Sequence, residues 1–252
     1  MFRVLKHLII GVLFLVCCTT SPVTQHTQSI PSQKSRQGFD NSTLENDKFP
    51  CVISLHKNDG GFVGSGVLIS PYYILTAGHC ISRDDITEVH LFDGRVHCVR
   101  ELIQHKQHAM GPFIINDIGI IALDEPILDV KTYDLCSNIL GMYKFQDVDI
   151  CGYGGNWKKQ SQFGMFKFYG ILLHESDLFK ILPIQGSVWF GDSGGGAFAY
   201  IDGKKQLIGI ISSFSAMKIN GSNVIIENSF VRVDRYIPWI SKVISETPNE
   251  IQ

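Results

Sequence analysis

The sequence predicts an all-β fold, organised as a barrel or a sandwich. From about residue 50 onward, short apolar segments recur at intervals of roughly 8–15 residues, with Gly, Asn and Asp between them. Helical spacing is confined to 235–246, where Ile237, Ile240 and Ile244 fall on one face. With 252 residues, 44% of them hydrophobic, the chain can form one substantial unit or two small ones that share an interface.

The strands are predicted where β-branched and aromatic residues run between turn residues. In chain order they are 51–56, 66–69, 73–76, 88–92, 99–105, 117–123, 148–153, 165–173, 207–213 and 229–234. A hairpin turn is expected at 58–61, where Asn and Asp precede two glycines.

The N-terminus predicts export. Arg3 and Lys6 precede the apolar run 8–16, which is too short to span a bilayer, so residues 1–18 read as a signal peptide. The alternative is a buried N-terminal helix. The end of this segment resembles the lipobox of bacterial lipoproteins with Cys18 as the lipidated residue, although Cys17 stands where a small residue is usual.

Residues 19–48 are rich in Ser, Thr and Gln and lack apolar periodicity, which indicates a linker or propeptide. A lipid anchor on such a stalk and simple secretion both remain open. We therefore expect a secreted, periplasmic or cell-envelope protein, which touches a membrane only through an N-terminal lipid.

Charge and cysteine content exclude several classes of function. The net charge is −2 and no run of Lys or Arg occurs, which argues against a nucleic-acid partner. No CxxC pair suggests zinc, and we expect neither a metal nor another cofactor. Five of the seven cysteines belong to the folded part, which predicts two disulfides and one thiol in an oxidising compartment. These five are Cys51, Cys80, Cys98, Cys136 and Cys151.

Three segments carry side chains that can act together in catalysis. An apolar strand ends in a small-residue turn at His79, Asp117 opens an apolar strand, and Ser193 is embedded in glycines. Each has an ordinary structural explanation alone: a structural His, a turn Asp, a flexible loop. Together they fit nucleophilic catalysis, in which a His takes the proton of a Ser and a buried carboxylate orients the His.

The order of these residues separates the classes of serine hydrolase. The segment 191–195 also fits the G-x-S-x-G elbow of α/β-hydrolases, but those enzymes place the His after the Ser. Here all nine histidines precede Ser193, the last being His174. A subtilisin-like order would need a carboxylate motif before His79, and no segment resembles one.

The segments 76–80, 116–118 and 191–195 resemble the three signature segments of the trypsin/chymotrypsin family, here in a bacterial-type exported member. The likeness runs from about residue 50 to the closing helix, roughly four-fifths of the chain. It implies two six-stranded antiparallel barrels, about 49–135 and 136–234, then the helix 235–246. The whole domain would span 49–246, with the active site in the cleft between the barrels.

The resemblance implies a serine endopeptidase that cleaves protein or peptide substrates through an acyl-enzyme. Ser193 would be the nucleophile, His79 the general base and Asp117 the residue that orients it. Backbone N–H groups of Gly191 and Ser193 would form the oxyanion hole, and Ser212 would support Asp117. The alternative is a catalytically silent family member that acts as a binding or regulatory module.

One departure from the family concerns activation. Asp192 would form a buried ion pair with an α-ammonium created by proteolysis, but the usual Ile-Val start is missing. Counting back from Pro50 places the new terminus within 37–39, after cleavage near Arg36. The resemblance therefore adds an activating protease as a partner and makes the chain a zymogen.

Other departures concern the specificity pocket and the disulfides. Ser187 occupies the pocket floor where trypsin-like enzymes carry Asp, whereas Glu227, followed by Asn228, stands near its back and could restore a preference for basic residues. Phe214 either crowds the entrance and favours small or medium apolar side chains, or packs elsewhere. Because Val63 and Trp189 replace expected cysteines, the pairings inferred are Cys80 with Cys98 and Cys51 with Cys136.

Overall fold

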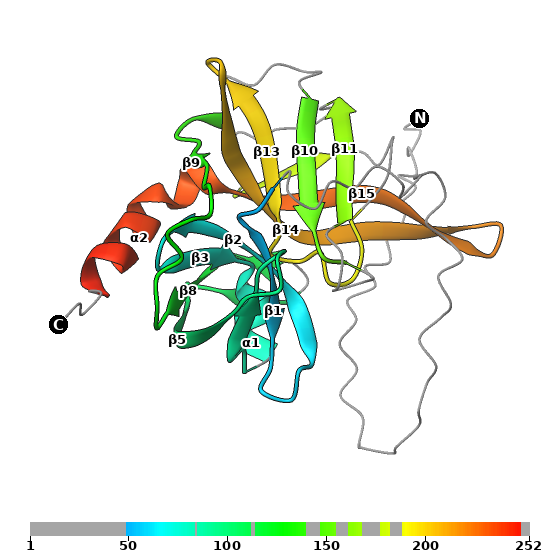
Figure 1. Ribbon diagram of the computed structural model, residues 1–252. Helices are drawn as coiled ribbons and strands as arrows, with labels where there is room; N and C mark the ends of the chain where they lie inside the picture. Colours follow the sequence, from blue (N-terminus) through cyan, green and yellow to red (C-terminus); the bar gives the residue numbers. More distant parts are fainter. Residues whose placement is uncertain are drawn as a thin grey trace, which may run out of the picture.

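In the computed structural model, the described residues form a closed antiparallel barrel, a seven-stranded mostly antiparallel sheet, a two-stranded ribbon and a C-terminal helix (Figure 1). The structure describes residues 49–83, 85–111, 114–139, 147–154, 161–167, 177–181 and 188–247. The predicted signal peptide 1–18 and linker 19–48 lie outside these residues. No helix in the described part is long and apolar enough to cross a membrane.

The first sheet closes into a barrel in the order β1-β2-β3-β8-β5-β4. Its strands are β1 (Val52–His56), β2 (Phe62–Ser70), β3 (Tyr73–Thr76), β4 (Glu88–His90), β5 (Val96–Gln104) and β8 (Gly119–Leu123). The short helix α1 (Gly78–Arg83) follows β3, and the two-residue strands β6 (Ala109–Met110) and β7 (Ile114–Ile115) form a ribbon before β8. β1, β3 and β8 are buried along their whole length, which explains their continuous apolar runs.

The second sheet has seven strands in the order β11-β10-β13-β14-β15-β12, with β9 pairing β14 in parallel. The strands are β9 (Asp134–Leu135), β10 (Asp147–Gly152), β11 (Ser161–Lys167), β12 (Leu178–Ile181), β13 (Gly196–Ile201), β14 (Lys204–Ile219) and β15 (Ser222–Arg232). The second six-stranded barrel was predicted as closed, whereas among the described residues no pairing joins β11 to β12. The all-β class, the first barrel and the terminal helix are as predicted.

The helix α2 (Val233–Glu246) begins two residues before the predicted start. It buries Val233, Tyr236, Ile240 and Val243, which recur at helical spacing. These residues join the core of the first barrel, although the helix follows the last strand of the second sheet. The helix, drawn in red in Figure 1, contacts β9 and β14 of the second sheet. The helix thus ties the two halves together.

The five described cysteines are thiols rather than halves of disulfides, so the predicted pairings are wrong for this structure. Cys51 lies in the first hydrophobic core and Cys136 in the second, which keeps that pair apart. Cys98 is exposed on β5, whereas Cys80 is buried in α1 with its Sγ 3.7 Å from the Ser193 carbonyl oxygen.

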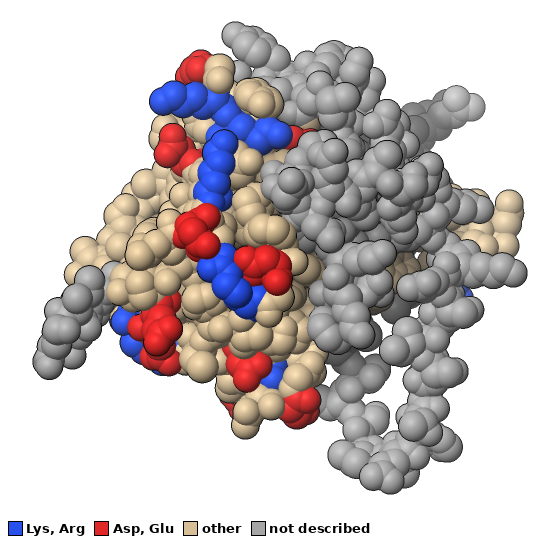
Figure 2. All heavy atoms as spheres, in the orientation of Figure 1, with Lys and Arg blue, Asp and Glu red and all other residues tan. Residues whose placement is uncertain are grey.

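Charged side chains on the face shown in Figure 2 are mixed in sign rather than gathered into one patch. Arg95, for example, pairs with both Asp93 and Asp129 on the surface. Lys205 pairs with Asp149. Such a surface provides no extended field of one sign on this face.

Candidate active site

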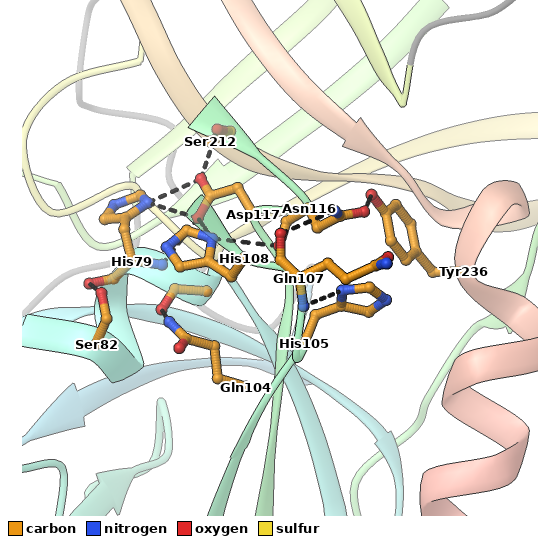
Figure 3. A network of polar contacts seen from close by, with 11 residues as sticks. His79, Ser82, Gln104, His105, Gln107, His108, Asn116, Asp117, Ser212 and Tyr236 are labelled. Atoms are coloured by element: carbon orange, nitrogen blue, oxygen red, sulfur yellow. Dashed lines mark hydrogen bonds and ion pairs between the residues drawn. The ribbon is translucent and has the colours of Figure 1, made fainter. Parts of the chain in front are cut away.

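His79 and Asp117 meet at one end of the first barrel. β3 and β8 pair in register with Thr76 opposite Gly119, so α1, which follows β3, lies beside the segment that precedes β8. His79 Nδ1 is 2.8 Å from Asp117 Oδ2 and 3.1 Å from Oδ1 (Figure 3). The backbone N–H of His79 also donates to Oδ1 at 2.8 Å. The carboxylate therefore fixes both the ring and the backbone of His79.

Ser212 brings the second sheet to the same carboxylate. It lies on β14, and its hydroxyl donates to Asp117 Oδ2 at 2.6 Å. Asp117 is 1% exposed. Burial would raise the pKa of the Asp117 carboxyl, but the hydrogen bonds from His79 and Ser212 hold that pKa below its ordinary value. The residue is thus a buried carboxylate stabilised in its charged form.

The electrostatics of His79 follow from the same contacts. Burial alone would lower the pKa of the His79 imidazole, whereas the neighbouring Cys80 sulfur and the Asp117 carboxylate raise it, and the net shift is upward. A ring in this setting readily holds a proton on Nε2 while Nδ1–H stays directed at Asp117.

The Ser193 loop has an unusual backbone. Gly191 and Gly194, on either side of Ser193, have φ of 93° and 85°, which side chains rarely adopt. The N–H groups of Asp192, Gly194 and Gly195 donate to Trp189, Ile211 and Asp192 carbonyls. In contrast, the N–H groups of Gly191 and Ser193 have no acceptor among the described residues. Within the described part of the chain, these two neighbouring donors are therefore free of other hydrogen bonds.

The first barrel contacts the Ser193 loop through its backbone. The Ser193 carbonyl oxygen accepts the Ser65 N–H at 2.8 Å and faces the Cys80 Sγ, next to His79, at 3.7 Å. Ser65 Oγ in turn donates to the Gly191 carbonyl at 2.9 Å. Within the described residues, no hydrogen bond joins the Ser193 hydroxyl to His79; the loop and α1 are adjacent through Cys80.

Asp192 is fully buried beneath this loop. Its Oδ1 accepts the Gly154 N–H at 2.7 Å, and its Oδ2 accepts the Trp189 N–H at 2.8 Å. Backbone donors from two segments thus hold the carboxylate in place. The α-ammonium predicted to pair with Asp192, within 37–39, lies outside the described residues.

Three aromatic rings gather beside Gly191. Phe214 stacks on Trp189 with ring centroids 5.7 Å apart and meets Phe190 edge-on at 5.4 Å. Trp189 is 40% exposed and Phe190 62% exposed. Phe214 therefore forms part of an exposed apolar surface next to the Ser193 loop, which we call the aromatic cluster (Trp189, Phe190 and Phe214).

The remaining residues predicted for the specificity pocket are differently placed. Glu227 forms an ion pair with Lys180 at 2.8 Å, so its charge is compensated. Asn228 is fully buried, and its side chain accepts the Val188 N–H at 3.2 Å and donates to the Ile181 carbonyl at 3.5 Å. Ser187 lies outside the described residues.

A polar network behind Asp117 was not predicted. His108 lies 3.9 Å from Asp117, and Asn116 joins Gln107 to the hydroxyl of Tyr236 on α2 (Figure 3). The sequence gives little signal for it, because the segment that carries His108 has no regular apolar spacing. Although imidazoles and a carboxylate gather here, the described residues contain no cluster suited to a metal ion.

Comparison with known proteins agrees with this architecture. Residues 64–210 match the family described as the trypsin-like peptidase domain. Coagulation factor IX of Oryctolagus cuniculus is 24% identical over 249 residues, covering 86% of this chain and 87% of that protein. Granzyme M of Homo sapiens is 29% identical over 90 residues, 33% of this chain and 35% of the relative. Lectizyme of Glossina austeni is 32% identical over 105 residues, 36% of each chain. The chain therefore belongs to the trypsin-like peptidase family.

Proposed function

We propose that this protein is an exported serine endopeptidase that cleaves peptide bonds through an acyl-enzyme, with Ser193, His79 and Asp117 as its catalytic residues. The observation that carries the proposal is the convergence on Asp117. His79 from the first barrel and Ser212 from the second sheet both bind this buried carboxylate. Burying a charge destabilises a protein unless the charge is paired and hydrogen-bonded. A buried carboxylate that orients an imidazole is the arrangement that nucleophilic catalysis by a serine requires.

The proposed reaction begins with Ser193 Oγ attacking the carbonyl carbon of the substrate. His79 Nε2 takes the hydroxyl proton as the new C–O bond forms, and then gives it to the leaving amine. Asp117 stabilises the imidazolium, in line with the raised pKa of His79. Water, activated by the same ring, then releases the acyl group and restores Ser193.

The N–H groups of Gly191 and Ser193, which have no acceptor in the described segments, support an oxyanion hole at this loop. Donors aimed at the developing negative charge lower the barrier most when they need not be released from other partners. The positive φ of Gly191 allows its backbone to turn without a side chain.

The surroundings support a preference for apolar substrate side chains. The aromatic cluster presents exposed ring faces beside Gly191, and such surface favours apolar contact. The Lys180 ion pair removes the free negative charge with which Glu227 could select Arg or Lys. Profiling with a peptide library tests this preference directly.

Export and activation complete the proposal. Cleavage near Arg36 would release the protease domain, 49–246, with linker residues 37–48 still attached, and the new terminus would supply the α-ammonium for Asp192. The position of Asp192 supports a switch at this point, because its carboxylate is buried directly beneath the Ser193 loop. N-terminal sequencing of active protein that retains residue 30 would refute the cleavage.

The test of the proposed activity is labelling with a fluorophosphonate before and after limited proteolysis. We expect labelling to require Ser193, and Ser193→Ala to lower kcat by roughly 10⁴–10⁶-fold. Ser245→Ala, which removes an exposed hydroxyl on α2, is the matched control and is expected to keep full activity. A wild-type chain that stays unlabelled under both conditions would instead favour the catalytically silent module.

A further inference from the structure

A second imidazole faces the proposed catalytic carboxylate. The His108 side chain is 4% exposed and approaches Asp117 in addition to His79 (Figure 3). Its Nδ1 lies 3.9 Å from Asp117 Oδ1 and 3.3 Å from the backbone oxygen of Asn116. The proposed chemistry described above makes no use of this ring.

The contacts of His108 define its tautomer. A carbonyl oxygen only accepts hydrogen bonds, so Nδ1 must carry a proton to bind the Asn116 carbonyl. The other nitrogen, Nε2, is buried and has no hydrogen-bond partner among the described residues. The neutral Nδ1–H form therefore fits this site, since a proton on Nε2 would bury a charged N–H without an acceptor.

We propose that His108 is a positioning residue for Asp117, which rests on the proposed catalytic role of that carboxylate. Its Nδ1–H donates to the Asn116 carbonyl, which leaves the positive end of this dipole 3.9 Å from Asp117 Oδ1, the oxygen that also accepts the His79 backbone N–H. The dipole stabilises the negative charge of Asp117 from 3.9 Å, a distance too long for a hydrogen bond, so it does not take the place of the hydrogen bonds from His79. The position of the charge is thus set by contacts from opposing sides.

The orientation of His108 depends on a fixed acceptor. Asn116, whose carbonyl receives the Nδ1–H, has φ of 48° and is held by its side chain. Its amide donates to the Gln107 carbonyl at 3.0 Å, and its Oδ1 accepts the Tyr236 hydroxyl at 2.9 Å. Helix α2 therefore fixes the peptide that aims His108 at Asp117.

Removing the dipole should strengthen the pull of Asp117 on His79. The titratable groups that surround His108 are Asp117, His79 on α1, and His105 on its own segment, with Tyr236 of α2 behind Asn116. Without the Nδ1–H, the carboxylate is less stabilised and interacts more strongly with the His79 imidazolium. The pKa of His79 is then expected to rise.

Two substitutions separate positioning from packing. His108→Phe keeps the ring volume and removes the N–H, whereas His108→Asn loses volume but keeps an N–H donor near the place of Nδ1. His97→Gln, which removes a histidine on β5 that interacts with Asp129 instead, is the control. If His108 only fills space, His108→Phe should disturb the protein less than His108→Asn. If His108 positions Asp117, His108→Asn should disturb the His79 pKa less than His108→Phe.

The measurement is an NMR titration of the His79 ring in the intact chain, together with the acid limb of kcat/KM. We expect His108→Phe to raise the His79 midpoint by roughly half a pH unit or more, and His108→Asn and His97→Gln to leave it near wild type. KM should stay unchanged. An unmoved midpoint in the folded Phe variant, or a larger shift in Asn than in Phe, overturns the proposal.

The titration does not depend on turnover, so it separates this inference from the proposed function. If fluorophosphonate fails to label Ser193 while the His79 midpoint still responds to His108→Phe, the coupling stands and the protease assignment fails. If labelling succeeds and the midpoint does not respond, only the role of His108 is lost. If His108→Phe does not fold, His108→Asn decides. A His79 midpoint in His108→Asn that differs from wild type by more than roughly half a pH unit overturns the proposal, and an unchanged midpoint supports it.

Discussion

Gly194 shows how closely the Ser193 loop is packed against the first barrel. Its φ is 85°, and a Cβ at this position would collide with the Ser65 carbonyl oxygen and with Thr76 Oγ1. These two atoms are hydrogen bonded to each other at 2.8 Å, so neither can move aside freely. The glycine therefore permits the contact that places Ser193 beside α1.

We expect Gly194→Ala to destabilise the protein by about 3 kcal/mol or more, because it adds a backbone collision to the strain of a positive φ. Gly203→Ala is the matched control, since its φ is 77° but nothing lies within 4 Å of a Cβ there. It should cost only about 1 kcal/mol. Urea denaturation measures both, and equal losses would show that packing at Gly194 has no special importance.

At the residue scale, the sequence predicts chemistry better than it predicts contacts. The residue types and order around His79, Asp117 and Ser193 indicate nucleophilic catalysis without a structure. The partner of Glu227 could not be predicted, because Lys180 reaches it only through the pairing of β12 with β15. His108 was missed for the same reason: a loop, not a periodic element, carries it to Asp117.

At the scale of elements, strands with continuous β-branched character were predicted closely. The predicted 73–76 coincides with β3, and 51–56 differs from β1 by one residue. β13 was missed because Gly and Ala dilute its β-propensity, although four of its residues are buried. The two-residue strands β6, β7 and β9 have no pattern long enough to detect.

The start of α2 contains a buried ion pair between two residues that are close in the sequence, Arg232 and Asp234. Arg232 is 1% exposed and donates to Asp234 through Nε at 3.0 Å and Nη2 at 2.6 Å. Asp234 Oδ2 also accepts the Ile139 N–H at 3.4 Å. The pair thus joins the end of β15, the first turn of the helix and the segment after β9.

We expect Asp234→Ala to destabilise the protein by roughly 3–5 kcal/mol, because it leaves the Arg232 charge buried without its partner. The double variant Arg232→Met with Asp234→Ala should recover much of this loss, since no unpaired charge remains. Asp129→Ala, which removes an exposed partner of Arg95, should change stability little. Chemical denaturation tests all three, and a double variant as unstable as the single one would contradict the argument.

At the scale of the whole molecule, the two sheets share a core rather than merely touching. The core of the first barrel includes Cys151, Phe198 and Leu207 from the second sheet, together with the buried face of α2. Asp117 and Ser212 meet across the same junction. Stability and the geometry of the site are therefore expected to respond together when the junction is disturbed.

The pH dependence of stability follows from a buried histidine in the first barrel, His56, which stacks on the partly exposed His90. His56 is fully buried and stacks on His90 with ring centroids 3.8 Å apart. Burial, and secondly His90, lower the pKa of His56, against smaller opposite effects of the Gly60 carbonyl and Glu88. Below about pH 6.5, the ordinary value, the unfolded chain binds a proton that folded His56 resists. The contribution of His56 to stability is therefore complete above that pH and is lost as the pH falls toward its lowered pKa.

We therefore expect wild type to lose more unfolding free energy than His56→Gln as the pH falls from about 7.5 to about 5, because glutamine cannot take up the proton. His97→Gln on β5 is the control, since it removes one histidine but leaves the stacked pair intact. The raised pKa of His79 acts in the opposite direction and over a higher pH range, and it is common to all three proteins. The contribution of His56 is therefore the difference in unfolding free energy between wild type and His56→Gln at each pH. Urea denaturation at several pH values measures this difference, and parallel curves for wild type and His56→Gln would assign the acid sensitivity to other groups.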